Sequence, residues 1–525
     1  MAAANYAIQL NNIKKTFGTV VANDNINLNV KQGEILALLG ENGSGKTTLM
    51  NILSGIYQPD HGQIFVDGQP VQIHSPEDSK RYGIGMVHQH FKLVDVFSAA
   101  DNILMGENSR GGFFLRKNRF DKIDSICRRF GFELDSRKLV KNMSVSEKQT
   151  LEIIKVLYYG AKVIILDEPT AVLTVQEVRK LFDVLRKMKE SGHSIVIITH
   201  KLNEVMEISD RVAILRKGVY IDTVETASTN EQQLTELMVG QKIDINITRS
   251  QVPQTSPLLE IRNLTVNNDE GSVAIDKLNF YIRGGEILGV AGIAGCGQKE
   301  LCEAIAGLRK IESGCINYKG DNLVGLPPKA IIEKGISMSF IPEDRLGMGL
   351  APALSIVDNV ILKKYSTLSR SPFVDRKCGR QEATEIVADL GVVTPSLDTP
   401  VRLLSGGNVQ KVLVGREIKS GPNVIITAYP VRGLDINSSY LIYDILNKEK
   451  EKGTGILFVG EDLDVMMALC DKIMVICHGR LMGVVFSDKT SKEQLGLMMT
   501  GSLDLSDKGG KIAGIAKDTN IREGE

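Results

Sequence analysis

The stretch GENGSGKTT, Gly40 to Thr48, satisfies the pattern G-x-x-x-x-G-K-[ST] completely. It follows the strand-like run EILALL and opens the helical stretch KTTLMNIL, which is the context that a phosphate-binding loop requires. Its glycines let backbone N–H groups close on phosphate oxygens, while the start of the helix adds partial positive charge. We expect Lys46 to bridge the β- and γ-phosphates of ATP and the Thr47 hydroxyl to bind Mg²⁺. The residues predicted to bind ATP in this loop are Gly40, Glu41, Asn42, Gly43, Ser44, Gly45, Lys46, Thr47 and Thr48.

A second motif, KVIILDEPT from Lys162 to Thr170, supplies the acidic residues that such a loop needs. Its apolar run is typical of a buried strand, and it brings Asp167 to the metal and Glu168 to the attacking water. A general base must lie within hydrogen-bonding reach of its water, so adjacent carboxylates after a buried strand suit these two roles. Taken alone, the motif also fits a strand that ends in a solvated acidic turn. Beside the phosphate-binding loop, metal binding and catalysis are the better interpretation.

The chain repeats one module twice. QGEILALLG at Gln32–Gly40 returns as GGEILGVAG at Gly284–Gly292, 252 positions later, and Pro169 matches Pro430, 261 positions later. Within each half, β-rich runs such as KVIILD and SIVIIT alternate with helical stretches, which predicts an α/β fold with a mainly parallel sheet. The predicted boundaries are a first module at 1–245, a linker at 246–257, a second module at 258–502 and a flexible tail at 503–525.

The second copy of the loop keeps the glycine spacing but loses the chemistry. Gly292, Gly295 and Gly297 remain, yet Gln298 and Lys299 stand where the lysine and the metal-binding hydroxyl belong. In the matching acidic motif, Ala428 replaces the predicted metal ligand and Tyr429 replaces the predicted base. Losing one electrostatic donor at such a site costs about 10²–10³ in rate, so the combination predicts negligible hydrolysis at this loop.

The bulk composition limits the partners. The chain has 525 residues with 63 basic and 63 acidic side chains, so its formal net charge is zero and it lacks the basic excess of a nucleic-acid binder. No apolar stretch approaches the ~20 residues that span a bilayer. The sequence therefore predicts no nucleic-acid partner and no membrane-spanning segment, and any membrane association is expected through partner proteins.

With these motifs, the chain resembles an ATP-binding-cassette (ABC) ATPase in which two cassettes are fused, over nearly all of both repeats. The resemblance implies two tandem P-loop cassettes, each with a parallel sheet core, a helical signature subdomain (about 90–159 in the first half) and an antiparallel β subdomain. It also implies roles for three further residues. Gln89 would be the lid glutamine, acting in catalysis and on Mg²⁺; His200 would be the switch histidine that holds the γ-phosphate; Phe17 would stack on adenine.

In this family, ATP lies between the phosphate-binding loop of one cassette and the signature loop of the other. The second half carries LLSGGNVQK, whereas the first carries NMSVSEKQT, in which Val145 and Ser146 replace the glycines. The resemblance thus implies one working site, made of the first half's loop and the second half's signature, and one degenerate site. The signature residues predicted to bind ATP are Ser405, Gly406, Gly407 and Asn408, and the degenerate site is assigned Gly292, Gly295, Gly297, Gln298, Lys299, Glu343, Ala428, Tyr429, Glu461, Ser144 and Ser146.

The motifs LSGGNVQK and IPEDR resemble those of ATPase subunits of bacterial importers for simple sugars, and GIGMVHQHFKLV is similar to the branch that imports purine nucleosides. Tyr429 departs from that branch, where a glutamine is more usual. The resemblance implies ATP and Mg²⁺ as cofactors, two transmembrane permease subunits that dock near residues 91–102 and 344–353, an extracytoplasmic solute-binding protein, and a peripheral location on the cytoplasmic face of the inner membrane. Nucleoside import is the first reading; import of ribose- or galactose-type sugars or of riboflavin stays open, as does a distant alternative, a soluble twin-cassette ATPase acting on ribosomes or DNA.

Overall fold

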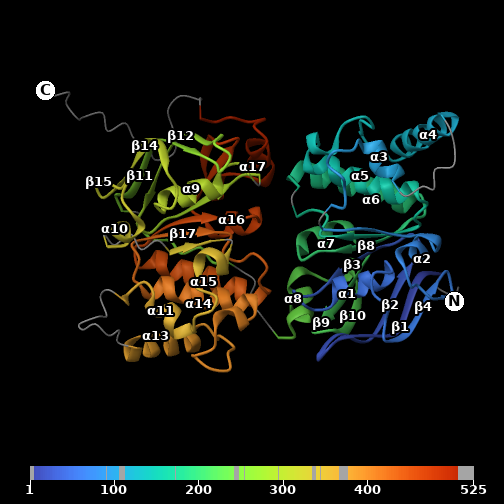
Figure 1. The fold of residues 1–525 in the computed structure, drawn as a ribbon, viewed down its shortest axis with the longest axis horizontal. Helices are drawn as coiled ribbons and strands as arrows, with labels where there is room; N and C mark the ends of the chain where they lie inside the picture. The colour runs from blue at the N-terminus through green and yellow to red at the C-terminus, as the bar shows by residue number, and fades with distance from the viewer. Residues whose placement is uncertain are drawn as a thin grey trace. The chain divides into compact units, whose positions relative to one another are not determined.

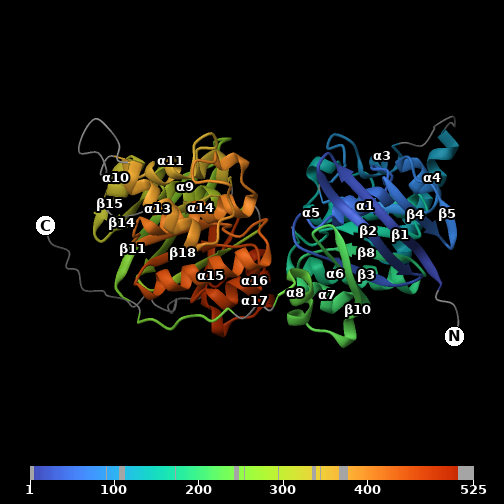
Figure 2. The same ribbon diagram turned by 90° about the horizontal axis from the view of Figure 1, so that it is seen from below.

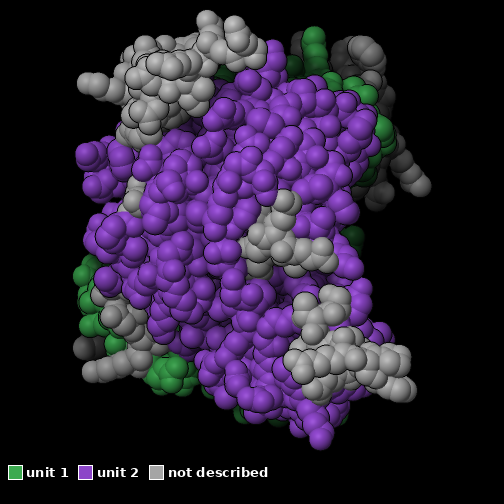
Figure 3. All heavy atoms as spheres, turned by 90° about the vertical axis from the view of Figure 1, so that its left-hand side faces the viewer, with its two compact units in different colours: residues 1–244 green, residues 245–525 purple. Residues whose placement is uncertain are grey.

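The structure is a computed structural model that describes residues 5–89, 91–105, 113–171, 173–241, 247–253, 255–293, 295–333, 339–342, 344–365 and 376–506. The chain divides into two compact units, residues 1–244 and 245–525, which are coloured separately in Figure 3. In each unit, sheets are flanked by helices (Figures 1 and 2).

The first unit is built on a six-stranded sheet in the order β10-β9-β3-β8-β7-β6. All pairings except β9 with β10 are parallel. The three central strands β3, β7 and β8 are buried along their whole length, as their apolar runs predict for a sheet covered on both faces. The strands are β3 (Ile35–Leu39), β6 (Ile84–Val87), β7 (Val163–Asp167), β8 (Ser194–Ile198), β9 (Arg211–Arg216) and β10 (Val219–Glu225).

A four-stranded antiparallel sheet, in the order β2-β1-β4-β5, packs beside this central sheet. Alternating buried residues such as Ile26, Leu28 and Val30 of β2 join a core shared with helix α1 and one face of the central sheet. The elements are β1 (Tyr6–Phe17), β2 (Val20–Lys31), β4 (His61–Val66), β5 (Gln69–Val71), α1 (Lys46–Leu53) and α2 (Pro76–Arg81).

The predicted helical subdomain of the first unit is confirmed. Helices α3 (Ala99–Leu104), α4 (Phe113–Phe130) and α5 (Val145–Tyr158) enclose a small core of their own, in which Ile103, Ile123 and Ile154 are buried. On the face of the central sheet opposite to α1, α5 packs together with α6. The remaining helices are α6 (Val175–Glu190), α7 (Leu202–Ile208) and α8 (Glu231–Val239).

The second unit repeats both sheets in the same spatial order. Its six-stranded sheet runs β16-β17-β18-β13-β19-β20, and its antiparallel sheet runs β12-β11-β14-β15. The strands of the first are β13 (Ile287–Ala291), β16 (Ser339–Ile341), β17 (Val424–Ala428), β18 (Gly455–Val459), β19 (Lys472–Cys477) and β20 (Arg480–Phe486); those of the second are β11 (Pro257–Asn267), β12 (Val273–Arg283), β14 (Ile311–Tyr318) and β15 (Asp321–Asn322).

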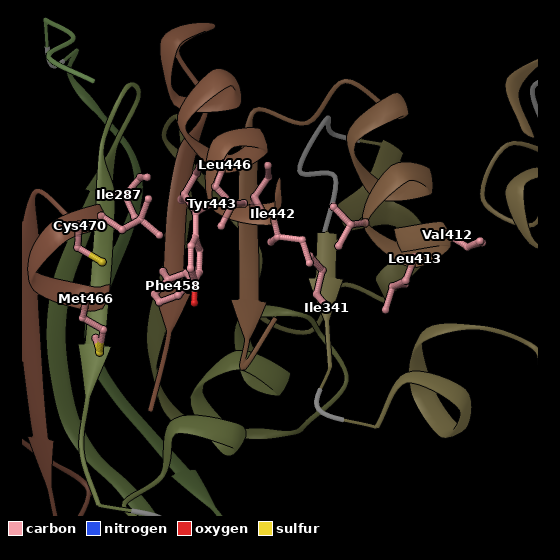
Figure 4. Close-up of a cluster of buried hydrophobic side chains, with 14 of the residues drawn as sticks. Ile287, Ile341, Val412, Leu413, Ile442, Tyr443, Leu446, Phe458, Met466 and Cys470 are labelled. Carbon is pink, nitrogen blue, oxygen red and sulfur yellow. The ribbon is translucent and has the colours of Figure 1, made fainter. Parts of the chain in front are cut away.

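One core of the second unit joins the central sheet to its helices. Ile287 of β13 and Phe458 of β18 lie with Tyr443 and Leu446 of α15 and Met466 of α16 in this cluster, part of which is shown in Figure 4. The helices are α9 (Gln298–Ile305), α10 (Pro328–Glu333), α11 (Ile356–Ile361), α13 (Arg376–Asp389), α14 (Gly406–Lys419), α15 (Ile436–Glu451), α16 (Leu463–Leu469) and α17 (Lys492–Met499).

The segments outside the predicted modules also contact the second unit. In the predicted linker, the Arg249 guanidinium donates to the carbonyl oxygen of Cys470 at 2.6 Å, and the Ser250 hydroxyl donates to Glu451 at 2.6 Å. At the start of the predicted flexible tail, Leu503 and Leu505 pack against the core, so this part of the tail belongs to the second unit. Residues 507–525 lie outside the described residues. Among the helices described, none is both long and apolar enough to cross a membrane.

Candidate active site

The loop between β3 and α1 has the backbone of a phosphate cradle. Gly40, Gly43 and Gly45 all have positive φ angles, of 156°, 79° and 95°. A Cβ at Gly40 would lie 2.3 Å from the Leu215 carbonyl oxygen, and one at Gly45 would lie 2.3 Å from that of Ala22. Gly43 meets no protein atom in that direction, so the loop is closed against the protein on two sides and open at its middle.

Lys46 is the first residue of α1 and is buried inside the loop. Its Nζ donates to the carbonyl oxygens of Gly40 at 2.6 Å and Glu41 at 3.0 Å. Burial lowers the pKa of Lys46, whereas the carboxylates of Glu168 and Asp167 act to raise it. The lysine is thus a positive charge held in a fixed place, surrounded by backbone oxygens that a phosphate oxygen would supplement. Of the other predicted residues, Ser44 is buried, Glu41 and Thr48 are half-buried, and Asn42 and Thr47 are exposed.

Asp167 and Glu168 lie where β7 ends. The side chain of Asp167 is buried, and burial together with the charge of Glu168 raises the pKa of Asp167 to about 6, against the lowering effect of Lys46. Glu168 has a positive φ of 49°, a conformation that is strained for a residue with a side chain, and its backbone N–H donates to the Ile198 carbonyl oxygen at 2.9 Å.

Parallel pairing brings the predicted catalytic residues to one edge of the sheet. His200 follows β8 by two residues, and its Nδ1 lies 2.9 Å from Glu168 Oε1. Gln89 follows β6 by two residues and is exposed; β6 pairs with β7 up to Val87 and Leu166. The loop after β3, which pairs with β8, opens at this same edge. The carboxyl edge of a parallel sheet is the usual place for a ligand.

The residues present fit a magnesium nucleotide. Glu168 Oε2 is buried and has no hydrogen-bond partner among the described residues, so it is an acceptor that lacks its donor. Two neighbouring carboxylates, one with a raised pKa, form a site that a divalent cation would neutralise. Carboxylate, hydroxyl and amide oxygens are ligands that Mg²⁺ takes in proteins, and Asp167, Thr47 and Gln89 offer them. These three residues would hold the ion.

Phe17, the predicted adenine platform, ends β1 and is 43% exposed, so part of its side chain is accessible to a ligand. Its ring centroid lies 5.2 Å from that of Tyr57, edge to face, and Lys15 Nζ lies 5.5 Å from the ring centroid. Tyr57 was not predicted from the sequence. The spacing of these two residues along the chain gives no signal, because the contact joins the end of β1 to the segment after α1.

In the second unit, the glycine loop is filled by its own glutamine. Gln298 is buried, and its Nε2 donates to the Ile293 carbonyl oxygen at 3.2 Å. A Cβ at Gly292 would lie 2.6 Å from that same nitrogen. Lys299 is 60% exposed and its Nζ lies 3.8 Å from Glu303 Oε1 on α9. Gly295 and Gly297 keep the positive φ angles of the first loop, 86° and 101°. The backbone is preserved while a neutral amide replaces the buried cation.

The acidic edge of this unit is replaced as well. Ala428 is buried in the core at the end of β17. Tyr429 has a positive φ of 53°, close to the 49° of Glu168, and its N–H donates to the Val459 carbonyl oxygen. Glu461 does not face a catalytic base; its Oε1 lies 3.2 Å from Arg432 Nε, and the Arg432 guanidinium lies 6.0 Å from the Tyr429 ring centroid. The strained turn is thus retained without its carboxylates. Glu343, also assigned to this site, lies outside the described residues.

The intact serine–glycine loop begins helix α14. Ser405 caps the helix and is exposed, and its Oγ accepts from Asn408 Nδ2 at 2.9 Å. Asn408 Oδ1 in turn accepts from the Val393 N–H at 2.9 Å. Gly406 is exposed and Gly407 is half-buried, so their backbone is accessible to solvent. They lie at the N-terminus of α14, a helix of fourteen residues. A hydroxyl, bare backbone and a positive helix end are arranged as an anion requires.

The first unit's copy of that loop is already occupied by a carboxylate. Ser144 caps α5 and forms a reciprocal capping box with Glu147, whose Oε2 accepts from the Ser144 N–H at 2.7 Å. Burial raises the pKa of Glu147, but hydrogen bonds from Lys138 and Ser144 outweigh it and hold the pKa below its usual value. Glu147 therefore stays ionised at the start of α5, beside Val145, which is 40% exposed, and the half-buried Ser146.

Two functional contacts escaped the sequence analysis. The capping box carries a readable signal, since Ser144 and Glu147 match the S-x-x-E pattern, which predicts a carboxylate at the start of α5. The Arg432–Glu461 pair carries no such signal, because the two residues follow different strands and meet only through the sheet.

Comparison with known proteins agrees with this architecture. The family model described as "ABC transporter" matches residues 23–171 and 275–430, once in each unit. The guanosine import ATP-binding protein NupO of Bacillus subtilis is 41% identical over 500 residues, covering 95% of this chain and 98% of that one. The nucleoside import ATP-binding protein NupA of Lactococcus lactis subsp. cremoris is 39% identical over 497 residues, covering 94% of this chain and 98% of that protein.

A ribose import ATP-binding protein, RbsA 1 of Rubrobacter xylanophilus, is 36% identical over 498 residues and is covered to 98%. Among solved structures, an archaeal ribosome recycling factor, aABCE1 in complex with the stalk protein aP1, matches with a TM-score of 0.57 over 88% of this chain and 87% of that chain. At 17% identity, this likeness shows the fold alone. Both units match the family model, and full-length relatives share more than a third of their residues with this chain. The chain therefore belongs to the ABC transporter family and carries two of that family's ATPase cassettes in one polypeptide.

Proposed function

We propose that this chain is the energy-coupling ATPase of a bacterial nucleoside importer, with a single hydrolytic site. The observation that supports a single site is that each unit has lost the motif that the other has kept. The first keeps Lys46, Asp167 and Glu168 but fills its signature with Glu147; the second keeps an open Ser405 loop but carries Ala428 at its acidic edge. A working site needs a phosphate-binding loop with its acidic residues and an open serine–glycine loop. We propose that the first unit supplies the former and the second unit supplies the latter.

In the proposed reaction, the protein contributes position and charge. Lys46 and the loop N–H groups bind the phosphates, and Ser405 with the start of α14 binds the γ-phosphate from the other side. Glu168, whose Oε2 lacks a donor, accepts the proton of the attacking water, while His200 steadies Oε1 of the same carboxylate and, when charged, also favours the γ-phosphate. Mg²⁺, when held by Asp167, Thr47 and Gln89, neutralises phosphate charge.

The solute is proposed from the relatives. The nucleoside and guanosine import proteins are 39% and 41% identical to this chain, against 36% for the ribose import protein. A simple-sugar importer is the second candidate, since a putative ribose, galactose and methyl galactoside import protein of Agrobacterium fabrum is 38% identical. Either role implies two permeases that dock near residues 91–102 and 344–353 on the cytoplasmic face of the membrane, and an extracytoplasmic binding protein that delivers the solute.

Transport by the assembled complex tests this function. The chain is purified with the permeases that co-purify with it, reconstituted in proteoliposomes with the binding protein, and assayed for ATP-driven uptake of labelled guanosine, adenosine and ribose. We expect nucleoside uptake that excess ribose does not inhibit. Ribose uptake without nucleoside uptake would favour the second candidate, and co-purification with ribosomes instead of membrane proteins would contradict an importer.

A further inference from the structure

Arg345 lies in the lid segment of the second unit, residues 344–350, which follows β16. The Asp344 side chain caps a five-residue turn, Arg345–Gly349, by accepting from the Gly347 N–H at 2.8 Å. The half-buried guanidinium of Arg345 leaves this turn and contacts two other loops. Its Nη1 donates to the carbonyl oxygen of Gly406 at 3.4 Å, and its Nη2 donates to the carbonyl oxygen of Arg432. One side chain therefore bridges the lid, the serine–glycine loop and the loop after β17.

Arg432 extends this bridge to a fourth loop. Its Nε lies 3.2 Å from Glu461 Oε1, on the loop after β18, and its guanidinium lies 6.0 Å from the ring centroid of Tyr429. We refer to Arg345, Arg432 and Glu461 as the arginine clasp. Three of the four loops follow neighbouring strands of the sheet, β16, β17 and β18. The clasp adds side-chain contacts among these loops and joins them to the serine–glycine loop, which precedes α14.

A second arginine fixes the other end of the lid segment. Arg416, which is buried in α14, donates from Nη2 to the Gly349 carbonyl oxygen at 2.7 Å and pairs with Glu417. The turn is thus attached to the first turn of α14 through Arg345 and to a position ten residues further along through Arg416. A displacement of the lid segment would act on the helix at both points.

The two units differ at this contact. In the second unit, a Cβ at Gly406 would lie 3.3 Å from Arg345 Nη1, so glycine lets the guanidinium lie against the backbone. The equivalent residue of the first unit is Val145. In the first unit, other side chains fasten the segment after β6 to α5. The Lys92 N–H donates to Glu152 Oε1 at 2.9 Å, and Lys155 Nζ donates to the Lys92 carbonyl oxygen at 3.2 Å. Near the start of the helix, Lys148 Nζ donates to Asp95 Oδ1 at 3.2 Å.

We propose that Arg345 is a positioning residue for ATP hydrolysis: through the Gly406 carbonyl, it holds the serine–glycine loop in the place where Ser405 meets the γ-phosphate, and it links that place to the lid on which a permease docks. This inference rests on the proposed function of the Ser405 loop. Arginine suits the task because its rigid planar fork carries donors on separate nitrogens, so Nη1 and Nη2 reach carbonyl oxygens on two different loops.

A positioning role predicts a particular kinetic pattern. The loop contributes to the transition state more than to ground-state binding, so its misplacement lowers kcat and leaves the KM for ATP nearly unchanged. Misplacement of a catalytic group by about 1 Å costs about a hundredfold in rate, and a partial loss of support costs less. We expect Arg345→Ala to lower the kcat of the full-length chain by about tenfold.

The experiment measures steady-state ATPase of the full-length chain, alone and in the permease complex, for Arg345→Ala, Arg345→Lys and the control Arg380→Ala. Arg380 belongs to the same unit and forms an exposed ion pair with Asp398 at 2.7 Å, so its loss removes an arginine without touching the four loops. The kcat of Arg380→Ala should match that of the unmodified chain. The kcat of Arg345→Lys should lie between that of the unmodified chain and that of Arg345→Ala. An unchanged kcat in Arg345→Ala, or a loss confined to KM, overturns the proposal.

A double-mutant cycle shows whether Arg345 acts through the serine–glycine loop. In the Ser405→Ala background, Arg345→Ala should cost less than about twofold, because the group that it positions is already absent. Additive losses overturn the proposal. Full activity of Ser405→Ala alone would contradict the proposed function itself, whereas a loss in Ser405→Ala with none in Arg345→Ala contradicts only the role of Arg345. If Arg345→Ala lowers the Tm by more than about 5 °C, a loss of activity could come from unfolding. The same cycle with Arg345→Lys in place of Arg345→Ala then tests the proposal.

Discussion

At the scale of single residues, Glu168 is the proposed general base, so we expect turnover to depend on it directly. It combines a strained backbone, a contact with His200 and a buried oxygen that lacks a donor among the described residues. Glu168→Gln keeps the shape of the side chain but removes its capacity to accept a proton. We expect kcat to fall by about 10²–10³ or more while ATP binding persists, because Lys46 and the loop are untouched.

The matched control for this variant is Tyr429→Phe, which alters the equivalent turn of the second unit. It should leave the ATPase rate within about twofold, since no hydrolysis is assigned to that unit. ATPase rates and equilibrium binding of a fluorescent ATP analogue give the two readouts. Substantial hydrolysis by Glu168→Gln would remove this residue from the mechanism.

Asp167 makes the nucleotide-free protein sensitive to pH. Its pKa is raised from 3.8 to about 6 by burial and by Glu168, so the folded chain holds this proton more tightly than the unfolded chain. Between these two pKa values, stability falls as the pH rises, because the unfolded chain releases the proton first. Above about pH 6, the ionised carboxylate is a net cost to the empty protein.

Asp167→Asn should therefore stabilise the nucleotide-free chain at pH 8, by about 1–2 kcal/mol, since each pKa unit corresponds to about 1.4 kcal/mol before solvent screening. The advantage should shrink as the pH falls from 6 towards 4. Thermal unfolding at several pH values measures it, and Asp276→Asn, on an exposed ion pair with Arg480, is the control. An advantage that is constant with pH would contradict the raised pKa.

The identities of the candidate site residues could be predicted from the sequence better than the contacts that they make. Lys46, Asp167 and Glu168 lie in contiguous motifs, so their spacing alone predicts that they meet at a sheet edge. The orientation of a side chain is decided by neighbours that are distant in the chain. This is why Arg432 beside Glu461 and Tyr57 beside Phe17 could not be predicted.

At the scale of elements, the two signature helices are a natural pair for comparison. Ser405 and Ser144 both cap a fourteen-residue helix, so replacing either removes one cap of similar value. They differ in what lies beside the cap: open glycine backbone at α14, and the carboxylate of Glu147 at α5.

Ser405→Tyr should lower kcat by about a hundredfold, since a large side chain blocks the approach of phosphate to the helix start. Ser144→Tyr should lower it by less than about twofold while costing a similar amount of stability, about 1 kcal/mol. Paired ATPase and unfolding measurements separate the two effects. Equal losses of activity would mean that both signatures take part in hydrolysis.

The elements themselves were largely predictable because local pattern decides them. Apolar runs between helical stretches indicated the buried parallel strands β3, β7 and β8, and the helical patterning of about 90–159 indicated the subdomain of α3, α4 and α5. The turn Arg345–Gly349 could not be predicted, because long-range contacts with α14 hold it.

At the scale of the whole chain, the two units should differ in their demand for metal. The first presents Asp167, Thr47 and Gln89; the second has Ala428 at the position of Asp167 and Lys299 at that of Thr47, where a cation repels a metal ion. With ATP and Mn²⁺ in place of Mg²⁺, we expect one bound metal ion per chain.

Electron paramagnetic resonance counts this Mn²⁺ directly. In the Glu168→Gln background, which prevents turnover, Lys46→Ala should abolish metal binding at moderate ATP concentration because the nucleotide that brings the ion is lost. Lys299→Ala should leave the count at one, as the control in the other unit. Two metal ions per chain would show that the second loop binds a magnesium nucleotide despite its substitutions.

The replacement of both acidic residues by Ala428 and Tyr429 has a consequence for the solute gradient across the membrane. In the proposed mechanism, an importer built on this subunit releases the free energy of one ATP in each round, however many nucleotides it binds. The steepest ratio of internal to external solute that it can sustain is then bounded by a single hydrolysis, and any futile turnover lowers the accumulated pool directly.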